Sequence, residues 1–288
     1  MKIQISTDST ADVSKELQKE LDISVLPLTI TYNDVDYKDG VDISEQEFYK
    51  ILSECETLPT TCAISPYEYT EYFEKLWKDG VTDLIHVSIN SKGSSTYQNA
   101  LIGKKTFFGE NPEAESQMNI TIIDSLNYSQ GYGLGVIQAA KMAKENKTPD
   151  EIVDFINDWI KHVKVVFIPL ELKCVKKSGR ISAAAAFMGD AIGLKPIIVF
   201  KDGEAVIPNK VRGEQKAVDF LVETLKQERK SGTAYSLAFA GNLDAYEKYK
   251  TKVYSDIDEK PTCEFPLGSI IATNTGPNAI GLVFYEDI

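Results

Sequence analysis

The first half of the chain alternates short apolar runs with amphipathic stretches in which apolar residues recur every three or four positions. The apolar runs predict strands at residues 2–6, 23–32, 83–89, 119–124 and 163–170. The stretches between them predict helices within residues 7–21, 44–52, 65–77, 90–105, 125–144 and 148–162. Because strands that alternate with helices are joined by crossover connections, we expect a mostly parallel sheet with helices on its faces.

Several of these helices have recognisable first turns. Ser65 and Glu68 have the spacing of a capping box, and Pro66 occupies the first helical position. Residues 44–47 and 148–151 repeat the same spacing of a hydroxyl residue and a glutamate. The starts of three helices are therefore predicted by local chemistry.

The second half has a different pattern, in which strands predominate. We expect strands at residues 196–200, 201–207, 234–240, 262–266 and 281–285, and helices near residues 217–227 and 244–250. The Asp202-Gly203 pair predicts a hairpin between the first two strands. The two patterns together indicate an N-terminal α/β domain of residues 1–160 and a C-terminal α+β domain of residues 161–288.

Composition narrows the functional classes. The chain has 288 residues, of which 43% are hydrophobic, and a formal net charge of −12. Such acidity disfavours nucleic acids and anionic membranes as partners, because both attract clustered lysine and arginine. We find neither a signal-peptide pattern nor an apolar run of the ~18 residues that a membrane span needs. We expect a cytoplasmic protein without stable membrane insertion.

The titratable residues offer few starting points for catalysis. The four cysteines are scattered without a C-x-x-C pair, which fits a reducing compartment and predicts no zinc site. His86 lies within an apolar run and His162 at the end of a helix, so a Ser-His-Asp triad or a histidine-rich metal site is not expected. We predict no catalytic residue, no metal and no cofactor.

Polar segments that follow predicted strands are the candidate binding elements, since ligands of open α/β sheets lie at the carboxyl ends of the strands. In residues 7–10, Asp8 and Ser9 either contact a ligand or metal, or cap the following helix. Residues 90–100 place four hydroxyl side chains at a helix start, a pattern typical of an anion site: Ser91, Ser94, Ser95 and Thr96.

Two further segments allow more than one interpretation. The three glycines of residues 131–135 lack the final glycine of a dinucleotide fingerprint, because Val136 stands there, and they favour close helix packing. A basic segment at 173–182 and another at 209–216 form either a solvated face or a surface for a partner or phosphate, and they contain Lys173, Lys176, Lys177, Arg180, Lys210, Arg212 and Lys216.

Residues 272–281, "ATNTGPNAIG", lie between two apolar stretches. The segment is either a polar loop at a strand end or one side of an anion pocket. It also belongs to an ordered set of motifs along the chain, namely "TDSTADV" at 7–13, "LPLTITYNDVDYKDGVDIS" at 26–44, "SSTYQNA" at 94–100, "DSLNYSQGYGLG" at 124–135, "KKSGRIS" at 176–182, "GLKPI" at 193–197 and "KVRGEQKA" at 210–217. Together these motifs closely resemble the DegV family over essentially the whole chain.

The resemblance implies a two-domain α/β fold with a long-chain fatty acid in a tunnel between the domains. Members of the FakB type present the acyl carboxylate to a fatty-acid kinase, which makes an acyl phosphate for phospholipid synthesis. The resemblance assigns the carboxylate to Thr61, Ser94, Asn274 and Thr275, pocket lining or support to Ser9, Cys62, Ser95 and Gly276, and partner docking to Lys177, Arg180 and Arg212. The protein would then be a carrier and not an enzyme.

This chain departs from the family pattern at the head-group loops. It has "TCAIS" at residues 61–65 where Thr-Ser-Gln-Pro-Ser is usual, and Ser95 where a glycine is usual. Asn274 precedes Thr275 where the family has a histidine, and an asparagine cannot become cationic. Two other hypotheses therefore stay open: a lipid-binding storage or sensing variant without a kinase, and an enzyme for a small anionic substrate around Asp8, Ser9, Ser94 and Asn274.

Overall fold

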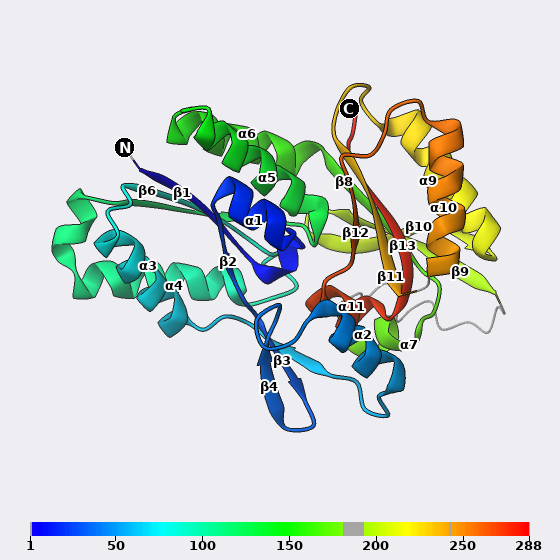
Figure 1. Cartoon of the computed structure of the whole chain (residues 1–288), viewed down its shortest axis with the longest axis horizontal. Coiled ribbons are helices and arrows are strands. Elements are labelled where there is room, and N and C mark those ends of the chain that lie inside the picture. The colour runs from blue at the N-terminus through cyan, green and yellow to red at the C-terminus, as the bar shows by residue number, and fades with distance from the viewer. Residues whose placement is uncertain (1, 181–192, 242, 288) are drawn as a thin grey trace. The chain divides into compact units, whose positions relative to one another are not determined.

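The computed structural model describes residues 2–180, 193–241 and 243–287, and the chain divides into two compact units (Figure 1). Unit 1 comprises Met1–Asp42 and Thr61–Lys161, and unit 2 comprises Ile43–Thr60 and His162–Ile288. Compared with the sequence-based division at residue 160, residues 43–60 and Lys161 are grouped differently. Residues 43–60 precede most of unit 1 in the chain but make their contacts in unit 2.

Unit 1 is built on a four-stranded parallel sheet of order β2-β1-β6-β7. Its strands are β1 (Ile3–Asp8), β2 (Ile23–Leu26), β6 (Asp83–Ser88) and β7 (Asn119–Asp124). The central strands are buried on both faces: Ile5 and Ile85 lie on one face, and Leu84 lies on the other together with the buried polar residues Ser6 and His86. Such two-sided burial is what a parallel sheet covered by helices on each face requires.

The helices of unit 1 lie on both faces of this sheet, with α1 and α5 on one side and α3 and α4 on the other (Figure 1). They are α1 (Lys15–Leu21), α3 (Pro66–Lys78), α4 (Thr96–Glu110), α5 (Gln130–Lys144) and α6 (Pro149–His162), with short 3-10 helices η1 (Ser9–Ala11) and η2 (Pro112–Ser116). The predicted capping box of α3 is present, since the Ser65 backbone N–H donates to Glu68 and the Glu68 backbone N–H donates to Ser65.

A second sheet in the structure has the order β4-β3-β5 and contains β3 (Thr29–Tyr32), β4 (Val35–Lys38) and β5 (Thr60–Cys62). The prediction of one strand over residues 23–32 is wrong, because β2 and β3 belong to different sheets. Pro27 separates them, and a proline cannot donate a backbone hydrogen bond to a ladder. The hairpin between β3 and β4 turns at Asn33 and Asp34, whose φ angles are 50° and 59°.

Unit 2 has a six-stranded mixed sheet of order β10-β9-β8-β13-β11-β12. Its strands are β8 (Val163–Pro169), β9 (Leu194–Lys201), β10 (Glu204–Arg212), β11 (Tyr235–Gly241), β12 (Cys263–Pro266) and β13 (Asn278–Tyr285). The β11–β12 pair is parallel and the other pairs are antiparallel. The predicted hairpin between β9 and β10 is confirmed, with φ angles of 49° at Asp202 and 77° at Gly203.

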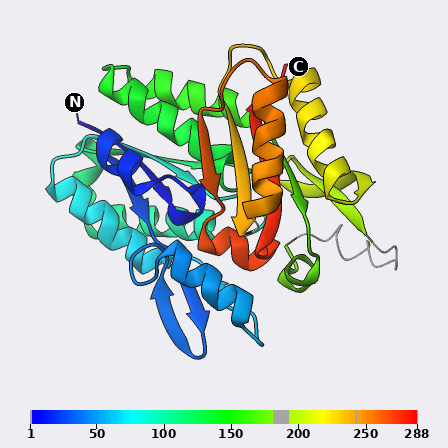
Figure 2. The same ribbon diagram turned by 45° about the vertical axis from the view of Figure 1, so that its right-hand side comes forward.

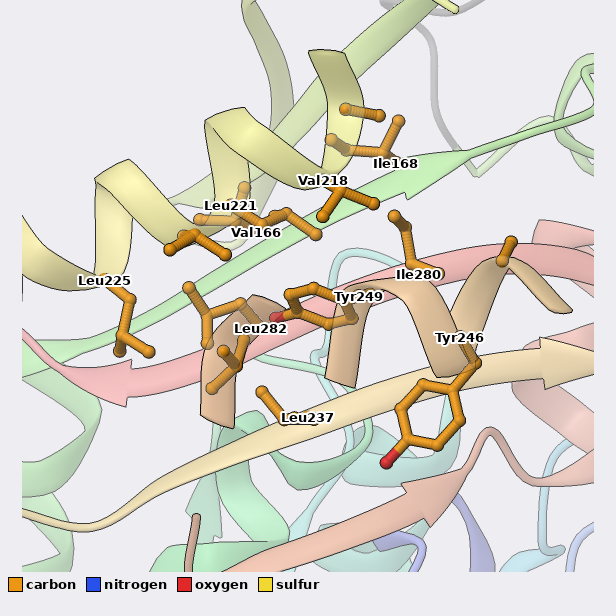
Figure 3. Close-up of a cluster of buried hydrophobic side chains, with 14 of the residues drawn as sticks. Val166, Ile168, Val218, Leu221, Leu225, Leu237, Tyr246, Tyr249, Ile280 and Leu282 are labelled. Carbon is orange, nitrogen blue, oxygen red and sulfur yellow. The ribbon is translucent and has the colours of Figure 1, made fainter. Parts of the chain in front are cut away.

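The helices of unit 2 are α2 (Glu45–Glu54), α7 (Lys173–Ser178), α9 (Glu214–Glu228), α10 (Leu243–Asp256) and α11 (Ser269–Thr275). Helices α9 and α10 lie side by side against the sheet (Figure 2). Their apolar faces meet the strands in a core that includes Leu221, Tyr249 and Leu282 (Figure 3). Helix α11 was not expected. Its last four residues, 272–275, are the first part of the segment 272–281, for which the sequence suggested a polar loop or one side of an anion pocket.

Candidate functional site

Polar segments gather at the carboxyl ends of the strands of unit 1, as the sequence predicts. Strand β1 ends at Asp8, β6 ends at Ser88 and β7 ends at Asp124, and the three strands are neighbours in the sheet. The segments that follow them therefore start from one edge of the sheet, which is the usual ligand edge of such sheets.

Asp8 is the most deeply buried acid at this edge, with 0% of its surface exposed. Its carboxylate accepts hydrogen bonds from the backbone N–H groups of Ile89 at 2.7 Å and Thr10 at 3.1 Å. Hydroxyl groups of Tyr132 at 2.6 Å, Ser88 at 3.3 Å and Thr10 also donate to it. Burial raises the pKa of Asp8, while the bonds from Thr10, Tyr132 and Ile89 oppose that rise. Asp8 caps only the short 3-10 helix η1, whereas the longer helix expected in this segment, α1, begins at Lys15 and is capped by Ser14.

Ser9 follows Asp8 and is half-buried. Its hydroxyl oxygen accepts a hydrogen bond of 3.1 Å from the backbone N–H of Leu28, which lies between β2 and β3. Strand β3 is in turn the neighbour of β5, the strand that contains Thr61 and Cys62. Ser9 therefore fixes the connection that leads to this small sheet.

Ser94 lies in the loop before α4, where its side chain makes local contacts. Its hydroxyl oxygen is 2.8 Å from that of Thr96 and accepts from the Thr96 backbone N–H at 3.3 Å. The backbone N–H groups of Gly93 and Ser94 both donate to the carbonyl oxygen of Asn90. A Cβ at Gly93 would lie 2.1 Å from the Tyr128 hydroxyl oxygen, so a larger residue there would require the Tyr128 side chain to move. Ser95 is exposed, and its side chain makes no capping bond to α4.

Thr61 is half-buried on β5, and its hydroxyl has no hydrogen-bond partner among the residues that the structure describes. Cys62 beside it is exposed. Three residues beyond Thr61, the carbonyl oxygen of Ile64 accepts a hydrogen bond of 2.8 Å from the side-chain amide of Asn99 on α4. The structure thus ties the segment of Thr61 to the helix whose first turn follows Ser94.

Asn274 and Thr275 lie on α11 in unit 2, together with Thr273. The Asn274 side-chain amide donates to the carbonyl oxygen of Ile270 at 2.8 Å, and the Thr275 hydroxyl donates to that of Ile271 at 3.1 Å. Asn274 retains a second amide hydrogen, whereas Thr275 must rotate to donate elsewhere. The segment 272–281 is therefore the end of a helix followed by the start of β13, and it is not an extended loop.

Gly276 ends α11 with a φ of 91°, a conformation that favours glycine. A Cβ at this position would lie 3.3 Å from the Cβ of Cys174 on α7, so the two short helices approach each other closely here. Burial raises the pKa of the Cys174 thiol, which fits a packing role for that side chain.

The three residues assigned to partner docking are exposed on unit 2. Lys177 lies on α7, Arg180 follows its end, and Arg212 is the last residue of β10. The Arg180 guanidinium donates to the carbonyl oxygen of Ser178 at 3.0 Å. Residues 181 and 182 of the motif at 176–182 lie outside the described part of the chain.

Each of the two histidines contacts an aromatic ring. His86 is buried between Ser6, 2.8 Å from Nδ1, and the Tyr69 hydroxyl, 3.1 Å from Nε2. Burial lowers the pKa of His86 to about 3, so its ring is neutral at physiological pH. His162 stacks on Tyr285 with 4.9 Å between ring centroids. Across the ranges that the structure describes, no group of three or more acidic, histidine or cysteine side chains is arranged to hold a metal.

Sequence reasoning missed Tyr132 and Asn99, which join segments that are far apart in the chain. The signal for Tyr132 was available in the glycines around it. A Cβ at Gly133 would lie 2.1 Å from the carbonyl oxygen of Ala11, so α5 packs directly on the turn after β1. The predicted close packing of these glycines is confirmed, and it brings the Tyr132 hydroxyl to Asp8.

Comparison with known proteins agrees with this architecture. The family model described as "Uncharacterised protein, DegV family" matches residues 2–287. A DegV domain-containing protein of Caldanaerobacter subterraneus subsp. tengcongensis is 33% identical over 99% of both chains. Two solved structures have a TM-score of 0.87: a fatty-acid-binding DegV family protein of Thermus thermophilus, 25% identical over 100% of both chains, and a stearic-acid-binding protein of Eubacterium ventriosum, 24% identical over 98% of this chain and 97% of that one. The chain therefore belongs to the DegV family.

Proposed function

We propose that this protein binds a long-chain fatty acid and presents its carboxylate to a fatty-acid kinase, which makes an acyl phosphate for phospholipid synthesis. The Thermus thermophilus relative, a DegV family protein that binds fatty acid, supports the lipid part of the proposal. The observation that carries it in this chain is the Thr61 hydroxyl, which is half-buried and free to donate. It stands on a segment that Asn99 ties to α4, next to Ser94.

A carboxylate that leaves water needs hydrogen-bond donors, because an unpaired buried charge costs several kcal/mol. We assign those donors to Thr61, Ser94, Asn274 and Thr275. Ser9, Cys62, Ser95 and Gly276 would line or support the pocket. The acyl tail would add roughly 0.8 kcal/mol for each methylene covered by apolar side chains, which is sufficient for tight retention of a long chain.

The protein would act as a carrier, and the kinase would supply the chemistry of phosphoryl transfer. A neutral, buried His86 that bonds Ser6 and Tyr69 offers no accessible general base. The exposed cations Lys177, Arg180 and Arg212 would steer an acidic surface of the kinase toward the head group.

One observation favours a second function, a lipid-binding storage or sensing role without a kinase. Asn274 cannot become cationic and already donates one amide hydrogen to Ile270. It therefore offers less charge compensation to a carboxylate, or to an acyl phosphate, than a histidine would.

Lipid extraction tests the proposal directly. Purified protein is denatured, and the organic extract is quantified by mass spectrometry; we expect about one long-chain fatty acid per chain. A Thr61→Val variant should retain less fatty acid and bind added oleate more weakly. Thr31→Val on the neighbouring strand β3 is the matched control, because Thr31 donates only to the exposed Asp36. Wild-type protein that carries no fatty acid and takes up no added oleate would refute the proposal.

A further inference from the structure

The turn after β1 joins three parts of unit 1 through the carboxylate of Asp8. One carboxylate oxygen accepts from Thr10 and from the Tyr132 hydroxyl on α5, and the other accepts from the backbone N–H of Ile89 and the Ser88 hydroxyl after β6. The end of β1, the end of β6 and the first turn of α5 are thus held by one buried acid.

The Tyr132 hydroxyl acts as a hydrogen-bond donor to Asp8. Burial, followed by the charge of Asp8, raises the pKa of Tyr132 well above the ordinary value of a tyrosine, so its phenol stays protonated and donates. Tyr132 also lies 2.5 Å from the Thr10 hydroxyl oxygen. A carboxylate accepts through both oxygens, whereas an asparagine amide has only one acceptor oxygen and would place N–H groups against existing donors.

The backbone that donates to Asp8 at Ile89 continues into the loop that holds Ser94. Asn90 follows Ile89, is fully buried, and accepts at its carbonyl oxygen the backbone N–H groups of Gly93 and Ser94. The position of the Ser94 hydroxyl therefore depends on the backbone at residues 88–90, which Asp8 holds.

The turn after β1 is also connected, through Ser9, to the sheet that contains Thr61. Ser9 accepts from Leu28, and Leu28 precedes β3, the neighbour of β5. The two unit 1 residues assigned to the carboxylate thus share one anchor, the turn at residues 8–9.

We propose that Asp8 is a positioning residue for the fatty-acid carboxylate: it holds the loop of Ser94, and through the adjoining Ser9 the strand of Thr61, in the geometry that binds the head group. This inference rests on the proposed function. It assigns Asp8 no contact with the ligand.

The test separates head-group binding from tail binding. Delipidated wild type and Asp8→Asn are titrated with oleate and with oleyl alcohol, which has the same tail and no carboxylate. We expect Asp8→Asn to lose oleate affinity about tenfold, the size expected for misplaced hydrogen-bond donors. Its affinity for oleyl alcohol should change little.

One further variant controls for general destabilisation, and another provides a second, milder test. Thr7→Val removes an equally buried hydrogen bond, 2.8 Å from the Thr7 hydroxyl to the Val87 carbonyl oxygen, one residue before Asp8. It should leave the ratio of oleate to oleyl alcohol affinity at the wild-type value. Tyr132→Phe removes a single donor to Asp8 and should lower that ratio by a smaller factor, so it serves as the test if Asp8→Asn does not fold.

The outcomes distinguish the two hypotheses. Wild type that binds neither compound refutes the proposed function. Wild type that binds oleate, together with a folded Asp8→Asn or Tyr132→Phe variant whose affinity ratio is unchanged, refutes only the positioning role. An equal loss for oleate and oleyl alcohol also overturns it, because Asp8 would then support the fold without acting on the head group.

Discussion

The side-chain amide of Asn99 donates a hydrogen bond of 2.8 Å to the backbone carbonyl oxygen of Ile64. Ile64 is 2% exposed, so this carbonyl depends on a protein partner, and the bond joins α4 to the segment that contains Thr61. A contact between two residues 35 positions apart thereby sets the geometry of a predicted binding site.

Asn99→Ala should therefore weaken both the fold and the site. Leaving a buried acceptor without its donor costs about 1–3 kcal/mol, which chemical denaturation of the delipidated protein would measure. Oleate affinity should also fall, because the segment of Thr61 is no longer fixed to α4. Gln98→Ala, at the exposed position next to it, should change neither quantity. An Asn99→Ala protein with wild-type stability would contradict the importance of this bond.

Stability should fall in mild acid because of His86. The unfolded histidine binds a proton below about pH 6.5, whereas folded His86 does so only near its pKa of about 3. The unfolded state therefore binds more protons in this window, and the free energy of unfolding falls as pH falls, by at most about 1.4 kcal/mol per pH unit from this group. Denaturation of wild type and His86→Gln at pH 7.5 and pH 5 would measure the difference.

In that experiment the His86→Gln variant should show a weaker loss between the two pH values than wild type. His162→Gln is the matched control, since His162 is the other histidine of the chain. Identical pH dependence in wild type and His86→Gln would show that His86 does not carry this effect.

Gly133→Ala should be strongly destabilising, because the new Cβ would lie 2.1 Å from the backbone carbonyl oxygen of Ala11. Overpacking against backbone costs typically about 1–3 kcal/mol. Gly109→Ala on α4 is the opposite case, with nothing within 4 Å of the added Cβ. It should raise stability by up to about 1 kcal/mol through helix propensity. Thermal melting of both variants checks the contrast, which fails if they shift in the same direction.

Asn274→His tests the consequence of the departure from the family pattern. With a cognate fatty-acid kinase, we expect the variant to make acyl phosphate faster than wild type, since a histidine can supply positive charge beside the carboxylate. Oleate affinity should rise more as pH is lowered from 8 to 6 in the variant than in wild type. Asn274→Gln controls for side-chain size. If all three proteins form acyl phosphate at the same rate, residue 274 does not determine the rate of phosphorylation.

Reversing the exposed charges at Lys177, Arg180 and Arg212 tests the docking surface. The triple change to glutamate should raise the KM of the kinase for the loaded protein and weaken its dependence on salt, while oleate binding stays unchanged. Lys105→Glu, exposed on α4 in unit 1, is the single-site control for added negative charge. Unchanged kinetics of the triple variant would argue against docking at these residues.

Local chemistry made much of this structure predictable. Ser65 and Glu68 specify the start of α3 within four residues, and Asp202 with Gly203 specify a hairpin, because the atoms that form each feature are neighbours in the chain. The motifs of the DegV family are likewise read directly from residue identities and their order.

Other features depend on residues that meet only after folding. Pro27 marks a break between two strands, because a proline cannot donate a backbone hydrogen bond. The sequence does not reveal that β3 joins a different sheet from β2. The segment 43–60 belongs to unit 2 because of its contacts there, and α11 forms where residue identities suggested a loop. Asp8 looked like a local cap, and its bonds to Ile89 and Tyr132 follow from the approach of β6 and α5. Caps and turns can be predicted from short sequence patterns, because their atoms belong to residues close together in the chain. Hydrogen bonds between residues 80 or more positions apart form only when the whole unit packs.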